Sequence, residues 1–193
     1  MVYVNTLISK QYLLIMNAPT PRTPAPELSF PLTNGEKWNL SEQNPESFTM
    51  VVFYRGLHCP VCKGYTQKLN KLVEEFKERG VEAVTVSMDS EERARTSVQE
   101  WEVDKLKVGY DLSEEQAREW GLYFSKAIKD EEPELFSEPG LFLIRPDGEL
   151  YYVAINSMPF GRPDLKSMLN ALDFILENDY PARGEVAELA LQD

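Results

Sequence analysis

The chain has 193 residues, of which 42% are hydrophobic and 11% aromatic, and this size and composition suit one globular domain with a sizeable core. Its 32 acidic and 20 basic residues give a formal net charge of -12, which repels phosphate backbones and anionic membrane surfaces, so we expect neither nucleic acid nor membrane partners. No apolar run approaches the roughly 18 to 20 residues that a transmembrane helix needs. We therefore expect a soluble, cytoplasmic protein.

The two ends of the chain are expected to lie outside the fold. Lys10 sits in the middle of the first segment rather than in a leading basic region, and no convincing cleavage site follows, so the pattern does not favour a secretory signal. Four prolines in residues 17–27 favour an extended arm. We predict an N-terminal extension over residues 1–23, a folded domain over 24–179 and a C-terminal tail over 180–193.

The first elements follow from turn residues and hydrophobic periodicity. An Asn34-Gly35 pair, which suits a tight turn, predicts a hairpin over residues 28–40. Residues 50–54 form a continuous apolar and β-branched run, typical of a strand buried on both faces of a parallel sheet. Apolar residues at spacings of three and four then predict an amphipathic helix over residues 60–79, and Gly80 ends it.

The later elements continue the alternation of strands and helices. Serine residues with acidic neighbours mark two further helix starts, and Pro146-Asp147-Gly148 marks the turn of a second hairpin. The polar, acidic residues 125–137 are interpreted as a loop. The predicted elements are a strand at 81–88, a helix at 90–103, a strand at 106–110, a helix at 113–121, strands at 141–145 and 149–155, and a helix at 164–176.

This order of elements predicts an α/β fold. Strand, helix, strand units connected in the right-handed sense build a mixed central sheet with helices on both faces. The helix that starts at residue 60 then begins at the carboxyl end of a central strand, where open α/β sheets place their functional sites.

Residues 55–63, RGLHCPVCK, stand at that junction and contain both cysteines of the chain. Two cysteines three positions apart close too small a loop to staple a fold. At a helix start, unpaired N–H groups and the helix dipole stabilise a thiolate, which favours Cys59 as the nucleophile. Pro60 suits the first helical position, and Cys62 lies one turn further on the same face. Cys62 can therefore resolve a mixed disulfide formed at Cys59.

Two other interpretations of the pair are weaker. A zinc site would need further ligands, yet the chain has one histidine, His58, and no second cysteine pair. Two inert structural cysteines would seldom fall together at a junction between a strand and a helix. We expect no bound cofactor or metal, and a redox-active Cys59-Cys62 disulfide in their place.

Together with these residues, four further segments are similar to the AhpC/TSA, or peroxiredoxin, family of redoxins. They are residues 24–28 (PAPEL), 51–54 (VVFY), 84–89 (VTVSMD) and 140–144 (GLFLI). The resemblance spans roughly residues 24–155 and implies a thioredoxin fold, thiol redox chemistry, antioxidant activity and a role in cell redox homeostasis. It is more specific for the fold than for the activity.

The sequence also departs from that family. The family pattern Pro-x-x-x-Thr-x-x-Cys, counted from Tyr54, falls on Arg55, Cys59 and Cys62, so only the last cysteine agrees. This alignment would make Cys62 the residue that attacks peroxide. A family arginine before the late strand falls on Pro139, where thioredoxin has a cis-proline. By this resemblance the peptide before Pro139 could be cis and place backbone against the sulfurs; the alternative is an ordinary turn proline.

The charged residues that flank the pair have open roles. Arg55 and Lys63 could each lower the pKa of a thiol by Coulomb attraction or could point into water. His58 could shuttle protons or simply pack. The buried acid that thioredoxin places beneath its cysteines has no counterpart in residues 50–54. The predicted site is Cys59, Cys62, Arg55 and Pro139.

Three functions fit these observations. The favoured prediction is a thiol-disulfide oxidoreductase that cycles the pair Cys59 and Cys62. The alternatives are a thiol-dependent peroxidase that reduces hydroperoxides, with a sulfenic acid as intermediate, and a redox-sensing binding module without turnover. The resemblance implies a reductant of thioredoxin or glutathione type, a disulfide or peroxide substrate, and a homodimer.

Overall fold

The computed structural model describes residues 19–186, so most of the predicted extension over residues 1–23 lies outside the described part of the chain. Its centre is a mixed five-stranded sheet in the order β5-β4-β3-β8-β9. Strands β3, β4 and β5 run parallel, whereas β8 and β9 are antiparallel to their neighbours. The strands are β3 (Phe48–Phe53), β4 (Val81–Val86), β5 (Lys107–Gly109), β8 (Gly140–Ile144) and β9 (Leu150–Ile155).

The central strands are buried on both faces, as their continuous apolar sequences predict. Every residue of β3 and of β8 is buried, and their side chains alternate between two separate hydrophobic clusters. Met50 and Val52 contribute to one cluster, whereas Val51 and Phe53 contribute to the other. The α/β thioredoxin-like fold with a mixed central sheet is therefore confirmed.

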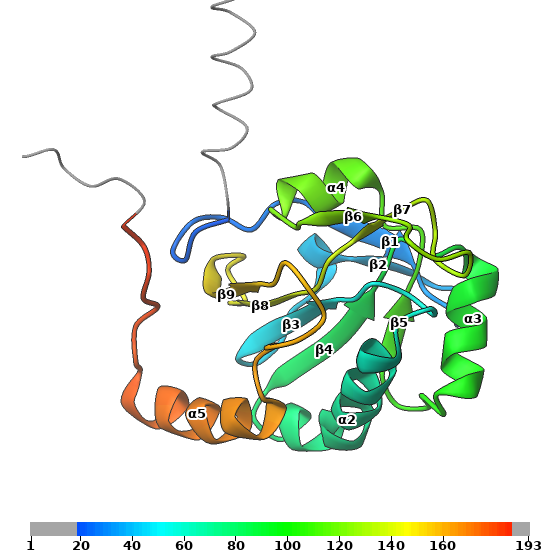
Figure 1. Cartoon of the computed structure of the whole chain (residues 1–193). Coiled ribbons are helices and arrows are strands. Elements are labelled where there is room, and N and C mark those ends of the chain that lie inside the picture. Colours follow the sequence, from blue (N-terminus) through cyan, green and yellow to red (C-terminus); the bar gives the residue numbers. More distant parts are fainter. Residues whose placement is uncertain (1–18, 187–193) are drawn as a thin grey trace, which may run out of the picture.

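Two helices cover one face of the sheet, where they lie side by side at the bottom of Figure 1. They are α2 (Pro60–Lys77) and α5 (Leu165–Asn178). Leu69 and Phe76 of α2 and Leu165 and Leu172 of α5 are fully buried against the sheet. The apolar stripe predicted from the spacing of residues in α2 is the face that packs. This packing fixes the start of α2 over the end of β3.

The opposite face is covered by the first hairpin and a short helix. The hairpin consists of β1 (Ser29–Pro31) and β2 (Lys37–Asn39), followed by the short 3-10 helix η1 (Leu40–Glu42), and the covering helix is α4 (Glu114–Glu119). Trp120, at the end of α4, is fully buried between the rings of Phe53 and Phe142. Helix α3 (Glu91–Glu100) packs beside β5 at the edge of the sheet (Figure 1).

Residues 125–137 are not the loop that their polar composition predicts. They contain most of a small hairpin of β6 (Phe124–Lys126) and β7 (Leu135–Ser137), in which Ser125 pairs with Phe136. Each strand has only three residues, too few for an alternating pattern to show in the sequence. Phe136 is nevertheless buried, so contacts with distant residues stabilise this hairpin.

Both described ends pack against the domain. The backbone N–H of Arg22 donates to the Leu150 carbonyl, and the Leu150 N–H donates to the Thr23 carbonyl, so the middle of the proline-rich arm pairs with the start of β9. At the other end Ala182 is buried, and the Tyr151 hydroxyl donates to the Tyr180 carbonyl. Among the described residues, no helix is long and apolar enough to cross a membrane.

Candidate active site around Cys59 and Cys62

Cys59 is the N-cap residue of α2. Its backbone is extended (φ -100°, ψ 103°), and its sulfur accepts a hydrogen bond from the backbone N–H of Cys62 at 3.2 Å. Pro60 occupies the first helical position, as predicted, because it has no N–H to leave unpaired. Both cysteines are free thiols, and Cys59 and Cys62 are 2% and 0% exposed. The structure thus brings the two predicted sulfurs together at a helix start.

The two thiols differ in acidity. A hydrogen bond from the Cys62 thiol, followed by the backbone N–H of Cys62 and the charges of Arg55 and Arg162, lowers the pKa of Cys59 to about 7 against the opposing effect of burial. The hydrogen bond that Cys62 donates, its burial and the Cys59 charge all raise the pKa of Cys62. At neutral pH a large fraction of Cys59 is therefore thiolate, whereas Cys62 stays a thiol.

A buried carboxylate supports the loop that precedes Cys59. Asp89, 2% exposed, accepts the Leu57 N–H at 2.7 Å and the Arg93 Nε–H at 2.7 Å. Gly56 has a φ of +129°, and a Cβ at this position would lie 2.6 Å from an Asp89 oxygen, so only glycine lets the loop pass the carboxylate. Sequence analysis found no buried acid in residues 50–54. Asp89 lies outside that segment, in the loop after β4.

Arg55 points into the protein rather than into water. Its side chain is 16% exposed, its Nε and Nη2 lie 3.6 Å from the carboxylates of Glu138 and Glu132, and its guanidinium packs 4.6 Å from the centre of the Phe136 ring. Glu138 is also buried and accepts the Ser125 hydroxyl at 2.6 Å. The β6-β7 hairpin is therefore tied to the residue that starts the cysteine loop.

Arg162 is a site residue that the sequence did not reveal. It lies in the loop between β9 and α5, where its Nη2 donates to the Val61 carbonyl at 3.1 Å and its guanidinium stacks 3.9 Å from the centre of the Tyr65 ring. Its charge helps to lower the pKa of Cys59. Because 101 residues separate it from Val61, only the fold brings it to the cysteines.

Three other sequence predictions have different outcomes. The described residues contain no cis peptide bond, so the predicted cis peptide before Pro139 is wrong; the Pro139 carbonyl accepts the Asn156 N–H, joining the residue before β8 to the end of β9. His58 packs on the Phe136 ring at 4.7 Å, and burial lowers its pKa. Lys63 is partly exposed and forms no ion pair with the described residues.

Several buried polar side-chain atoms lack a hydrogen-bond partner. Within residues 19–186, the buried side-chain nitrogen and oxygen atoms without a hydrogen bond belong to seven residues, all from the cysteine loop, the end of β7 or the chain after β9. The Tyr54 hydroxyl is one of them, although Ser87 and Ser97 lie close to it. The residues are Tyr54, Arg55, His58, Ser137, Glu138, Asn156 and Arg162.

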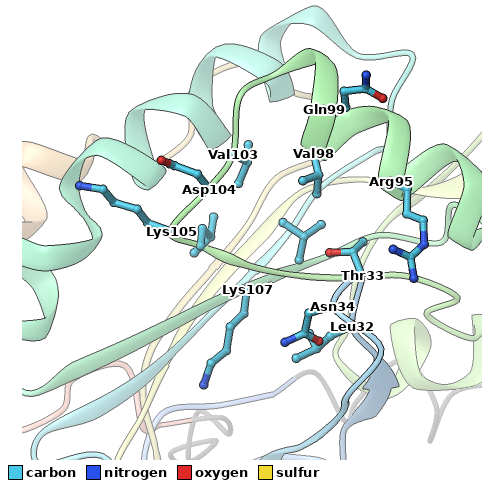
Figure 2. A pocket seen from close by; sticks show the side chains of 12 residues that line it. Leu32, Thr33, Asn34, Arg95, Val98, Gln99, Val103, Asp104, Lys105 and Lys107 are labelled. Carbon is cyan, nitrogen blue, oxygen red and sulfur yellow. The ribbon is translucent and has the colours of Figure 1, made fainter.

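The cavity in Figure 2 is separate from this site. It has a volume of about 410 Å³ and lies between the β1-β2 turn, α3 and residues 103–108. A second cavity of about 830 Å³ lies between residues 24–29, α4 and the turn at 145–148. Neither is lined by a cysteine. In the described part of the chain no group of three potential metal ligands occurs.

Comparisons with known proteins agree with the fold. The model of the AhpC/TSA family matches residues 21–153. Alkyl hydroperoxide reductase C from Helicobacter pylori is 25% identical over 174 residues, which cover 84% of this chain and 82% of that protein. Peroxidoxin BcpB from Mycobacterium tuberculosis superposes with a TM-score of 0.66 at 18% identity, over 81% of this chain and 98% of that one. A peroxiredoxin-like protein from Aquifex aeolicus gives 0.65 at 16% identity, over 82% and 88%.

Proposed function

Because this chain belongs to the AhpC/TSA family of thiol-dependent oxidoreductases, we propose that it is a peroxidase in which Cys59 attacks a hydroperoxide and Cys62 resolves the product. The observation that carries the proposal is the Cys59 sulfur at the N-cap of α2, held as an anion by the N–H and thiol of Cys62. A relative named alkyl hydroperoxide reductase C over most of the chain favours peroxide as the oxidant.

The proposed reaction has two chemical steps before reduction. The Cys59 thiolate attacks one oxygen of the hydroperoxide, the O–O bond breaks, and the leaving oxygen takes up a proton and departs as an alcohol, or as water from hydrogen peroxide. Cys59 is then a sulfenic acid. Cys62 loses its proton, its sulfur attacks the Cys59 sulfur, and water leaves as the disulfide forms. Two electrons pass from the sulfur pair to the peroxide, and a thiol reductant of thioredoxin or glutathione type returns them.

The positive charges beside Cys59 support the first step. The leaving oxygen develops negative charge as the O–O bond breaks, and preorganised cations or N–H donors stabilise such charge in a site that excludes water. The guanidinium groups of Arg55 and Arg162 act on the Cys59 sulfur, and each has a buried N–H without a hydrogen-bond partner. These groups would take the place of the proline and threonine that the family pattern has at this loop.

Cys59, rather than Cys62, is assigned the attack. Counting along the family pattern places the peroxide-attacking cysteine at Cys62, but burial and its hydrogen bond to Cys59 keep that thiol protonated. A thiolate is the reactive form, and Cys59 supplies it near neutral pH. Exchange with disulfide substrates remains the second candidate function, favoured by the same CxxC pair at a helix start.

The test follows the reduced protein through one reaction with hydrogen peroxide in a stopped-flow instrument. We expect oxidation about a hundredfold faster than that of free cysteine at the same pH, because positioned charges commonly contribute this much. Two thiols should be lost for each peroxide consumed. In Cys62→Ser, dimedone should trap a sulfenic acid at Cys59.

Three outcomes would contradict the proposal or its assignments. Oxidation no faster than that of free cysteine would contradict the peroxidase proposal. Turnover with disulfide substrates alone would then support thiol-disulfide exchange. If the protein showed neither activity, a redox-sensing module without turnover would be the remaining function. Rapid sulfenic acid formation at Cys62 in Cys59→Ser, with none at Cys59 in Cys62→Ser, would reverse the roles of the two cysteines.

A further inference from the structure

The cavity in Figure 2 lies at the outer edge of the central sheet. Strand β5 is the last strand on this side, and the β1-β2 hairpin covers its end through a bridge between Leu32 and Gly109 and a hydrogen bond from the Thr33 N–H to the Val108 carbonyl. The cavity, of about 410 Å³, lies between this hairpin, α3 and residues 103–108. Its volume falls within the roughly 300 to 1,000 Å³ that small-molecule sites have in proteins.

The floor of this cavity is apolar and is formed by both hydrophobic clusters of the core. Leu32 belongs to the cluster on one face of the sheet. The cluster on the other face contributes Val103, Leu106 and Val108, and Val98 of α3 packs against it while remaining partly exposed. An apolar group that enters the cavity would therefore be removed from water.

The charge of the cavity is opposite to that of the whole chain. Its charged side chains are three cations and one anion, whereas the chain has 20 basic and 32 acidic residues. The three cations are Arg95, Lys105 and Lys107, and the anion is Asp104. Both lysines are exposed, and neither lies within 4.0 Å of a carboxylate in the described residues. An anion would thus be repelled by most of the surface and attracted to this part of it.

The ion pairs already present leave this positive charge available. Asp104 accepts a hydrogen bond from the Asn70 amide at 2.8 Å, and Arg95 pairs with Glu91 at 2.7 Å on the exposed surface. Figure 2 shows the Arg95 side chain reaching from α3 toward the β1-β2 turn. An exposed pair contributes little to stability, so the carboxylate of a ligand can replace Glu91 on the Arg95 guanidinium at small cost.

The orientation of α3 favours a singly charged anion. Gln99, the last residue but one of α3, lines the cavity, which therefore lies at the carboxyl end of the helix, where the helix dipole is negative. Phosphate sites commonly use the opposite end of a helix, where free N–H groups donate to the oxygens. A carboxylate has a single charge and needs fewer donors. We infer that this cavity binds a small amphipathic carboxylate, with its charge at the three cations and its hydrocarbon chain on the apolar floor.

The volume of the cavity limits the length of that chain. One water molecule occupies roughly 30 Å³ in the liquid, so a cavity of about 410 Å³ holds about a dozen non-hydrogen atoms of comparable size. This number corresponds to a carboxylate of about eight to ten carbons. No cysteine lines the cavity, so the site does not depend on the proposed peroxidase reaction.

The experiment titrates octanoate into the reduced full-length protein and measures the heat by isothermal titration calorimetry. We expect one site with a dissociation constant below about 1 mM, which rises with salt concentration because charge attraction is screened. Acetate has the charge without the chain, and 1-octanol has the chain without the charge. Each should bind at least about tenfold more weakly than octanoate, and inorganic phosphate should bind no more tightly than acetate.

Two cavity variants and one control locate the site. Lys105→Glu/Lys107→Glu should weaken octanoate binding about tenfold, because it reverses the charge beside the carboxylate. Val98→Phe should weaken it by a similar factor with the charge unchanged, because the ring fills the cavity. Lys71→Glu/Lys166→Glu makes the same change of charge at two exposed lysines of α2 and α5 that line neither cavity, and should bind octanoate like the wild type.

Other outcomes overturn the inference. Octanoate binding that is unchanged in both cavity variants would place the ligand elsewhere, on exposed apolar side chains such as Phe174. Equal affinity for 1-octanol would show that the cations have no part in recognition, and tighter binding of phosphate than of octanoate would make the cavity a site for inorganic anions. Absence of binding to the wild type up to about 10 mM octanoate would show that the cavity is not a carboxylate site, and would leave the peroxidase proposal unaffected.

Discussion

The Cys59 sulfur depends on one neighbour more than on any other. Cys62 supplies both its backbone N–H, at 3.2 Å, and its thiol, whose hydrogen bond lowers the pKa of Cys59 more than the charges of Arg55 and Arg162 do. A resolving cysteine placed one helical turn from the nucleophile thus also activates it. The two roles are separable, because a residue other than cysteine can donate the hydrogen bond without resolving.

Replacing that thiol should change the acidity of Cys59. In Cys62→Ala the pKa of Cys59 is expected to rise from about 7 to about 8, towards the value near 8.5 of an ordinary cysteine, because the strongest hydrogen bond to the anion is lost. The pH dependence of alkylation by iodoacetamide measures it. Cys62→Ser, whose hydroxyl can still donate, is the control and should keep a midpoint near that of the wild type.

A Cys62→Ala midpoint that stays near 7 would show that the helix start and the two arginines are sufficient to hold the anion. The pKa of Cys59 in Arg162→Met would then show how much Arg162 contributes to lowering it. The relative size of the thiol and arginine contributions matters, because only the thiol contribution requires Cys62 to be reduced.

The sequence alone predicted the residues of the site that stand next to one another in the chain. Cys59, Pro60 and Cys62 reveal themselves by spacing and by the strand and helix on either side. Arg162 and Glu138 do not, because isolated charged residues far along the chain carry no pattern and reach the site only through tertiary contacts. Asp89 ends the family-like segment 84–89, but only the fold shows that it supports the cysteine loop. The cis peptide before Pro139 was predicted from resemblance to thioredoxin, and backbone geometry overturns it.

At the level of elements, burial decides which parts of the fold can be predicted. Strand β3 and helix α2 were predicted because each packs a long apolar run or stripe, which shows as a period in the sequence. The β6-β7 hairpin was missed because its three-residue strands carry no period and its acidic connection resembles a loop. What holds it is specific contact with the cysteine loop, through Arg55 and Phe136.

A double-mutant cycle should measure that link. Arg55→Met is expected to lower the free energy of unfolding by about 3 kcal/mol, because Glu138, 3% exposed, loses its cation and keeps a buried charge. Glu138→Gln should destabilise the wild type but be neutral or stabilising in the Arg55→Met background. The coupling between the two is expected to be about 1 to 3 kcal/mol, measured by urea unfolding of the reduced protein. Additive effects would mean that the ion pair between Arg55 and Glu138 contributes nothing to holding the hairpin and the loop together.

For the molecule as a whole, the apolar core and the buried charged groups occupy different parts of the fold. The core has two apolar clusters, one on each face of the sheet, whereas the buried carboxylates Asp89 and Glu138 lie, like the cysteines, at the edge of the sheet where β3 ends. Burying charge there costs stability, and the surrounding cations and hydrogen bonds offset that cost. The overall stability should therefore respond to the ionisation of the pair.

Stability of the reduced protein is expected to pass through a maximum between about pH 8 and 9. The folded pKa of Cys59, about 7, lies below the value near 8.5 of the unfolded chain, so its stabilising contribution is fully present above pH 8.5 and is lost as the pH falls through 7. The pKa of Cys62 is raised, so above pH 8.5 the unfolded chain ionises this thiol while the folded protein does not, and stability falls. Relative to Cys59→Ser/Cys62→Ser, the free energy of unfolding should rise by about 1 kcal/mol between pH 6.5 and 8.5 and fall at higher pH. Urea titrations under a phosphine reductant measure this difference, and a flat profile would mean that folding leaves the acidity of both thiols unchanged.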